Sequence, residues 1–123
     1  MTANDFRRIA LGFTDAIEGA HMGHPDFRVN GRIFATLHPD NKQGMVKVPP
    51  DAQEKFVRER PEVFSPENGA WGRQGCTRVQ LIAADEETLG EAMTLAWQDA
   101  TTKKAAGRSK PRPASPRRSS RKR

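Results

Sequence analysis

The sequence contains a single cysteine, Cys76, so the chain cannot form an internal disulfide. Because disulfides persist in oxidising compartments, this scarcity favours a reducing, intracellular setting. No apolar run approaches the roughly 20 residues that a membrane span requires, and residues 1–10 lack the charged, apolar and small-residue regions of a secretory signal peptide. We therefore expect a cytoplasmic protein that does not enter a membrane.

The chain also offers little of what catalysis requires. The GRQG segment at 72–75 is too short for a phosphate-binding loop and lacks the Lys-Ser/Thr that would follow one. Cys76 lies between Arg73 and Arg78, an arrangement that would lower the pKa of its thiol, although a lone cysteine that opens a strand more often simply packs. No nucleophile, base and orienting group can be assembled, so we expect a non-enzymatic protein without a cofactor.

Acidic residues are absent from the C-terminal end. The chain holds 21 basic and 15 acidic side chains; ten of the basic ones and none of the acidic ones follow position 102, which leaves residues 1–102 with a net charge of −4. The composition of residues 103–123, rich in Lys, Arg, Ser and Pro, offers nothing to bury. We expect one domain over residues 1–102 and a disordered basic tail over residues 103–123.

The tail favours a polyanionic partner. If all ten cations neutralised a phosphate, counterion release would give a log-log salt slope near −9 as an upper limit. Nucleic acid is the most available polyanion in a cytoplasm, whereas an acidic protein, a membrane surface or no partner at all are the alternatives. The tail residues predicted to contact nucleic acid are Arg117, Arg118, Arg121, Lys122 and Arg123.

The N-terminal segment predicts one helix. Phe6, Ile9, Ala10 and Phe13 recur at the spacing of a single helical face, which places the helix over about residues 4–13. The stretch at 16–22 contains a glycine after a weakening helical pattern and is compatible with a loop or with a short edge strand.

Residues 26–38 predict a hairpin around Asn30-Gly31, the dipeptide that best tolerates the positive φ angles of a type I′ turn. The register stays open. A two-residue turn pairs Val29 with Arg32, whereas a three-residue connection pairs Val29 with Ile33 and reverses which side chains face the core.

The rest of the domain contains three predicted strands and two predicted helices. We predict a strand at 45–48, a helix from Pro50 to about Arg60, a short strand at 63–64 and a half-buried strand at 76–84. Asp85 then caps a helix with an acidic first turn. This should be the longest helix, packed across the sheet beside the first one, with an apolar stripe that comprises Leu89, Met93, Ala96, Trp97 and Ala100.

Three segments carry a resemblance to a known family: HMGHPDFRVNGRIFATL at 21–37, VKVPP at 46–50 and GAWGRQGCTRVQL at 69–81. With the acidic start of the last helix, their order resembles the MmcQ/YjbR-like family of small bacterial proteins. The resemblance implies an α+β fold of the CyaY-like (frataxin-like) kind, in which one antiparallel sheet has helices packed on one face. Members of that family are commonly described as DNA-binding, through an arrangement called a double wing.

The uncovered face of such a sheet is the leading candidate for a nucleic-acid contact surface. Cations there would engage phosphates, and aromatic rings would stack on unpaired bases. Because the domain is net negative, the competing interpretation is an ordinary solvated sheet face. The predicted contact residues of the domain are Arg28, Arg32, Phe34, Lys47, Trp71, Arg73, Arg78 and Gln80.

The alternative hypothesis is a protein-binding or small-ligand-binding module that uses a groove near His21, His24, Phe34 and Trp71. Trp71 is equally compatible with lining such a groove and with covering an edge of the core. His21 and His24 are three residues apart, but Gly23 beside them argues against the helix that would let them share a metal. We therefore predict no metal site and, by default, a monomer.

Overall fold

The computed structural model describes residues 1–102. The helices and strands of this range follow one another in this order: α1 (Ala3–Leu11), β1 (Ile17–His21), β2 (His24–Val29), β3 (Arg32–Leu37), β4 (Gln43–Lys47), α2 (Pro50–Glu59), β5 (Phe64–Pro66), α3 (Gly69–Arg73), β6 (Cys76–Gln80), the 3-10 helix η1 (Leu81–Ala83) and α4 (Glu86–Thr102). In this part of the chain, no helix is long and apolar enough to cross a membrane.

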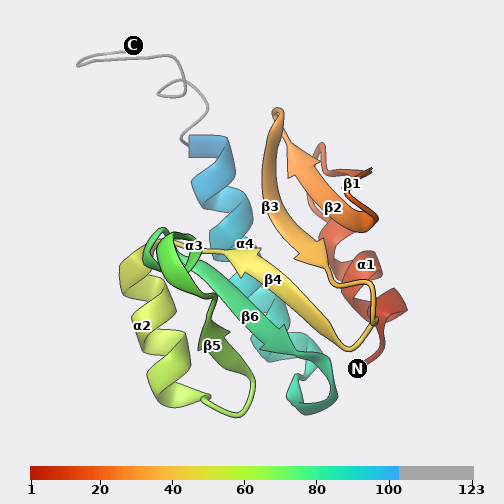
Figure 1. The fold of residues 1–123 in the computed structure, drawn as a ribbon. Helices are drawn as coiled ribbons and strands as arrows, with labels where there is room; N and C mark the ends of the chain where they lie inside the picture. The colour runs from red at the N-terminus through yellow and green to blue at the C-terminus, as the bar shows by residue number, and fades with distance from the viewer. Residues whose placement is uncertain (103–123) are drawn as a thin grey trace, which may run out of the picture.

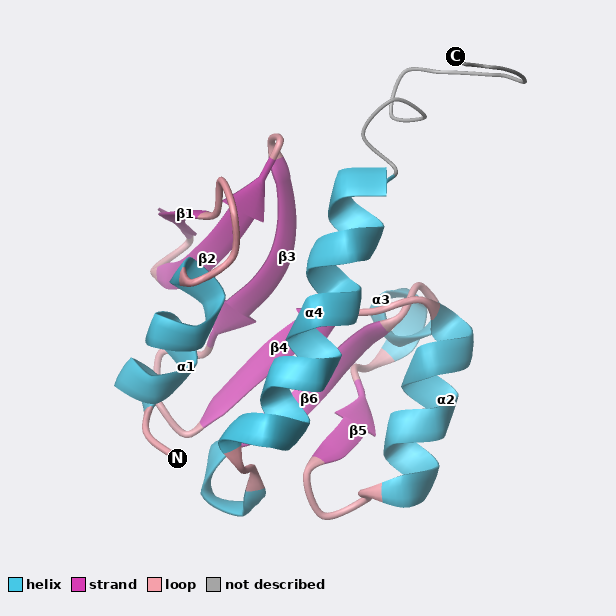
Figure 2. Cartoon of the chain, turned by 180° about the vertical axis from the view of Figure 1, so that it is seen from behind, coloured by secondary structure: helices cyan, strands magenta, loops and turns pink. Residues whose placement is uncertain are grey.

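The strands form one antiparallel sheet with the order β1-β2-β3-β4-β6-β5. Helix α4 crosses behind the sheet in Figure 1 and in front of it in the reverse view of Figure 2, with α1 beside it on the same face. Helix α2 packs against β5 at the opposite edge from α1. The predicted α+β fold is thus confirmed, and so is the prediction that the last helix is the longest and lies beside the first.

Local sequence signals explain where the helices begin. The Thr2 hydroxyl accepts a hydrogen bond from the backbone N–H of Asp5, whose carboxylate accepts one from the N–H of Thr2 in return, which completes a capping box at α1. Pro50 occupies the first turn of α2, where a missing N–H costs nothing. Asp85 accepts from the N–H of Thr88 at 2.7 Å and caps α4.

The core lies between the sheet and the α1–α4 layer. Its largest fully buried side chains include Phe6, Phe27, Phe34, Leu37, Leu89 and Met93. The Phe6 ring packs directly on the backbone of Gly44 in β4, where a Cβ atom would approach the ring to 2.5 Å. At the rim, the half-buried Trp97 stacks on Phe13.

The turn at Asn30-Gly31 has φ angles of 54° and 79°, as the sequence predicted for a type I′ turn. Val29 pairs with Arg32, so the two-residue connection is right at the turn itself. Farther from the turn, however, Phe27 pairs with Ala35 because the register shifts between Phe27 and Arg28.

This shift leaves Phe34 as the extra residue of a β-bulge, so neither predicted register holds along the whole hairpin. The bulge turns consecutive residues of β3, Phe34 and Ala35, into the core, where both are fully buried. Strict alternation of side chains along a strand places neighbouring residues on opposite faces of the sheet. For that reason the sequence pattern assigned Phe34 to the uncovered face and not to the core.

Three further segments differ from or extend the predictions. The undecided stretch at 16–22 is an edge strand, β1. The turn-rich segment before Cys76 contains the short helix α3, which the density of glycines concealed. The strand predicted at 76–84 ends at Gln80. The chain continues as η1, in which the side chain of Ile82 is almost fully exposed.

Candidate functional site

The face of the sheet opposite α1 and α4, called here the open face, carries a row of cross-strand partners. Asp26 of β2 pairs with Thr36 of β3, which pairs with Met45 of β4, which pairs with Arg78 of β6. Because side chains alternate along each strand, Arg28, Lys47 and Gln80 belong to the same face. The prediction that Lys47, Arg78 and Gln80 share the uncovered face agrees with this register.

Two hollows of about 420 Å³ and 300 Å³ lie over the open face and share five lining residues. The shared residues are His21, Thr36, Met45, Trp71 and Cys76. We call the two hollows together the open-face groove. Its larger part is also lined by Gly31, Arg32, Ile33 and Lys47, and its smaller part by His24, His38 and Glu67.

Asp26 is a carboxylate buried completely on the open face. Arg28 covers it with two hydrogen bonds, from Nε to Oδ1 at 2.7 Å and from Nη2 to Oδ2 at 3.0 Å, while His21 Nδ1 lies 2.7 Å from Oδ2. The hydrogen bond from Arg28, with that from His21, holds the pKa of Asp26 below its usual value despite burial, which acts in the opposite direction. Arg28 is therefore committed to an internal ion pair.

Arg78 is committed in the same way. Its Nη2 donates to Glu67 Oε1 at 2.9 Å, and the other carboxylate oxygen of Glu67 lies 3.7 Å from His38 Nε2. Arg78 Nε is buried and has no hydrogen-bond partner among the described residues. Two of the four predicted open-face contacts therefore neutralise carboxylates of the domain itself.

Three histidines gather at the smaller end of the groove. The rings of His21 and His24 are stacked with centroids 6.0 Å apart, and those of His24 and His38 meet edge to face at 6.2 Å. Within residues 1–102, no group of three or more His, Cys, Asp or Glu side chains is arranged to hold a metal ion. The cluster is a source of hydrogen-bonding ring nitrogens and of aromatic surface.

Cations without a carboxylate partner lie at the larger end. Over the described range, neither Arg32 nor Lys47 forms an ion pair. Trp71 of α3 lines the same hollow and has 68% of its surface exposed. This end of the groove therefore brings together an exposed aromatic ring, Lys47 of the open face and Arg32 of the hairpin tip, whose strand partner Val29 belongs to the core.

Several predicted site residues lie elsewhere. Phe34 is fully buried in the core, so its assignment to a contact surface, and to the groove of the alternative hypothesis, was wrong. Arg73 is exposed but lines neither part of the groove, and Gln80 lines a separate hollow beside Met1.

Burial raises the pKa of the Cys76 thiol, the opposite of the shift that a reactive cysteine would need.

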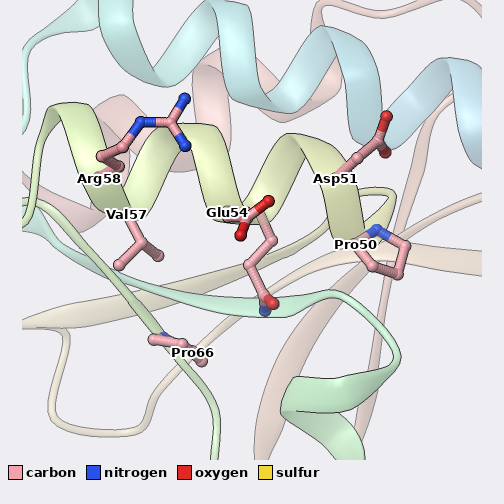
Figure 3. A pocket seen from close by; sticks show the side chains of 7 residues that line it. Pro50, Asp51, Glu54, Val57, Arg58 and Pro66 are labelled. Atoms are coloured by element: carbon pink, nitrogen blue, oxygen red, sulfur yellow. The ribbon is translucent and has the colours of Figure 1, made fainter.

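The five predicted contacts at 117, 118 and 121–123 lie outside the described residues. A further hollow of about 720 Å³ lies between α2 and β5 (Figure 3). There Gln53 donates to the backbone oxygen of Cys76 and to the hydroxyl of Thr77. The side chains labelled in Figure 3 are two acids, one arginine, one valine and two prolines. This hollow has no aromatic lining and no concentration of one charge.

Sequence reasoning missed several groove residues, among them Thr36, His38, Met45 and Glu67, and it missed Asp26 as the buried carboxylate of the open face. The strand alternation around Asp26 contained a signal, since it places this acid on the same face as Arg28. Glu67 carried no such signal, because it follows the three-residue strand β5 within a turn-rich segment.

Over residues 1–102, the fold and the groove define an α+β protein with one antiparallel sheet, four α-helices and an open face that carries paired charges, histidines and an exposed tryptophan. The YjbR family model matches residues 11–99, which is most of the chain, and the protein belongs to that family. The predicted family is therefore confirmed.

Among solved structures, the chain is similar to Deinococcus radiodurans protein DR2400, whose domain is assigned to the DUF419 family. The TM-score is 0.71 with 21% sequence identity over 83% of this chain and 80% of that one, a likeness that concerns the fold. No curated protein matches the sequence.

Proposed function

We propose that this protein binds single-stranded nucleic acid on its open face, with Trp71 as a stacking platform for an unpaired base and with Lys47 and Arg32 as phosphate contacts. The observation that carries this proposal is the combination of a 68% exposed tryptophan and two unpaired cations around one hollow. Stacking on an aromatic side chain is worth about 1–3 kcal/mol per base and tolerates any sequence.

The paired charges limit how the face can bind. Arg28 and Arg78 already neutralise Asp26 and Glu67, so phosphate contacts fall to the two cations that line the groove, Arg32 and Lys47. At about 0.7 per phosphate for a single strand, two contacts give a log-log salt slope near −1.4 for the domain alone. The ten basic residues after position 102 would add a steeper, sequence-independent contribution.

The test is a binding titration with a fluorescently labelled oligo(dT) and with a duplex of the same length, across a salt series. Trp71→Ala should weaken binding of the single strand by about fivefold or more, since one stacking contact is lost. Ile82→Ala, which removes another exposed apolar side chain away from the groove, is the matched control. Equal affinity of both variants for oligo(dT) would refute the open face as the binding surface.

Charge is tested separately. In a chain ending at Thr102, Lys47→Ala should reduce both the affinity and the magnitude of the salt slope. The control is Lys55→Ala, which removes an exposed lysine of α2 outside the groove and should leave the slope unchanged. Complete loss of binding on removal of residues 103–123 would confine the activity to the tail. Retained binding by residues 1–102, weakened by Lys47→Ala, is the expected result.

A small-ligand function is the second candidate, and the size of the groove favours it. The smaller hollow, about 300 Å³, corresponds to the lower end of small-molecule pockets, and His24, His38, Glu67 and Trp71 converge on it. Thermal denaturation with a nucleoside monophosphate separates the two functions. A raised melting temperature together with no oligonucleotide binding at any salt concentration would favour the small-ligand module.

A further inference from the structure

The end of β1 carries a histidine whose tautomer is set by a buried carboxylate. His21 Nδ1 lies 2.7 Å from Oδ2 of Asp26, and Asp26 is completely buried. An ionised carboxylate accepts hydrogen bonds and has none to donate, so the proton of this contact belongs to Nδ1 of the imidazole. Neutral His21 therefore has its lone pair on Nε2.

Asp26 is kept ionised and fixed in position by its other neighbours. Two guanidinium nitrogens of Arg28 donate to it at 2.7 and 3.0 Å, and that pairing lowers the pKa of the carboxyl group. On the neighbouring strand, Gly19 pairs with Asp26, and a Cβ atom there would lie 3.1 Å from Oδ1. The absence of a side chain at Gly19 thus leaves room for the carboxylate that orients His21.

The imidazole is at the same time accessible to a ligand. Its side chain is 45% exposed and lines both parts of the open-face groove, and no described residue forms a hydrogen bond with Nε2. The His24 ring stacks on its face with an interplanar angle of 20°, which helps to fix the ring plane. The groove thus contains an oriented hydrogen-bond acceptor in addition to the Trp71 stacking surface.

We infer that His21 Nε2 accepts a hydrogen bond from the ring N–H of a base stacked on Trp71, which selects bases with a ring N–H on the Watson–Crick edge, such as thymine, uracil or guanine. This inference rests on the proposed function and adds a base-reading atom to it. Asp26 is the positioning residue, because it holds the tautomer that leaves Nε2 unprotonated.

The test compares oligo(dT) with the same oligonucleotide carrying N3-methylated thymine, which keeps the phosphates and the stacking ring but has no N–H to donate. For the full chain, methylation should weaken binding by about three- to tenfold, the value of one hydrogen bond. Unchanged affinity would overturn the inference while leaving the proposed function intact. Failure of both oligonucleotides to bind would overturn both.

Two substitutions assign the effect to His21. His21→Asn keeps an amide N–H near the position of Nδ1, within reach of Asp26, but has no atom at the position of Nε2. His21→Gln places an amide oxygen near that position. The asparagine variant should bind both oligonucleotides equally, and the glutamine variant should retain part of the discrimination. Full discrimination by the asparagine variant would assign the N–H contact to another residue and overturn the inference.

A measurement on the unaltered chain covers the case in which either variant fails to fold. In the neutral form of the His21 ring, the 15N chemical shifts should show a protonated Nδ1 and an unprotonated Nε2. Oligo(dT) should shift the Nε2 resonance, and the methylated oligonucleotide should not. A neutral ring protonated at Nε2 instead of Nδ1, or equal shifts with both oligonucleotides, would contradict the assignment.

Discussion

Arg28 and Asp26 form a two-point ion pair on the open face, in which the carboxylate is fully buried while the arginine side chain is 37% exposed. Breaking such a pair by removing the cation leaves a buried charge without its principal partner. On the open face the domain therefore neutralises its own buried carboxylate, and we expect the main role of Arg28 to be in the stability of the fold.

Arg28→Ala should lower the free energy of unfolding by about 2–3 kcal/mol, because Asp26 would lose two charge-assisted hydrogen bonds in a buried position. Urea denaturation, read as a shift of the midpoint at constant slope, measures this loss. Arg58→Ala, which removes an exposed arginine of α2 without an ion pair in the described range, should stay within about 0.5 kcal/mol of the unaltered protein. Equal effects of the two substitutions would contradict the structural role of the pair.

The same carboxylate should make stability depend on acid pH. The pKa of Asp26 is lower in the folded protein than its ordinary value of 3.8, so the folded state holds fewer protons than the unfolded state around that pH. Its contribution is complete above the unfolded pKa and is lost as pH falls through the folded one. Urea midpoints measured downward from pH 5 should fall less steeply for Asp26→Asn; an unchanged slope would show that Asp26 does not contribute.

Two glycines should respond to alanine in opposite ways. At Gly44 the new Cβ would meet the Phe6 ring at 2.5 Å, and overpacking a filled core costs about 1–3 kcal/mol. At Gly90, within α4, a Cβ would meet nothing within 4 Å, and replacing a helical glycine stabilises by up to about 1 kcal/mol. Thermal denaturation should show a lower melting temperature for Gly44→Ala and a higher one for Gly90→Ala. A rise for both would mean that Phe6 does not pack on β4 as described.

Cys76 should be unreactive in the folded protein. Its side chain is buried and burial raises the pKa of its thiol, so little thiolate is present or accessible at neutral pH. Labelling with a thiol reagent at pH 8 should be slow for the folded chain and rapid in guanidinium chloride. Rapid labelling of the folded chain would indicate that the floor of the groove opens.

The fold was largely predictable because its strongest signals are local. The Asn30-Gly31 turn, the proline at the start of α2 and the Asp85 cap each determine backbone geometry within a few residues. The bulge at Phe34 was not predictable from alternation, since it depends on core space that both Phe34 and Ala35 fill. Long-range packing decides such a position.

The candidate site was predictable only in part. The open-face groove is lined by His21, His24, Lys47 and Trp71, among others. The sequence had predicted His21, His24 and Trp71 at one groove and Lys47 on the uncovered face of the sheet. The sequence could not show which cations form ion pairs within the domain. Arg78 pairs with Glu67, which lies eleven residues earlier in the chain, before a helix and a turn. The same limit applies to Phe34, whose burial follows from the bulge.

The most direct measurement of the central claim is the emission of Trp71 during an oligo(dT) titration of the full chain carrying Trp97→Phe, which leaves Trp71 as the only tryptophan. Complex formation is followed in parallel by the anisotropy of the labelled oligonucleotide. Binding on the open face predicts quenching of Trp71 that saturates together with the anisotropy. A complex that forms with no change in Trp71 emission would contradict the account and assign nucleic-acid binding to another part of the chain.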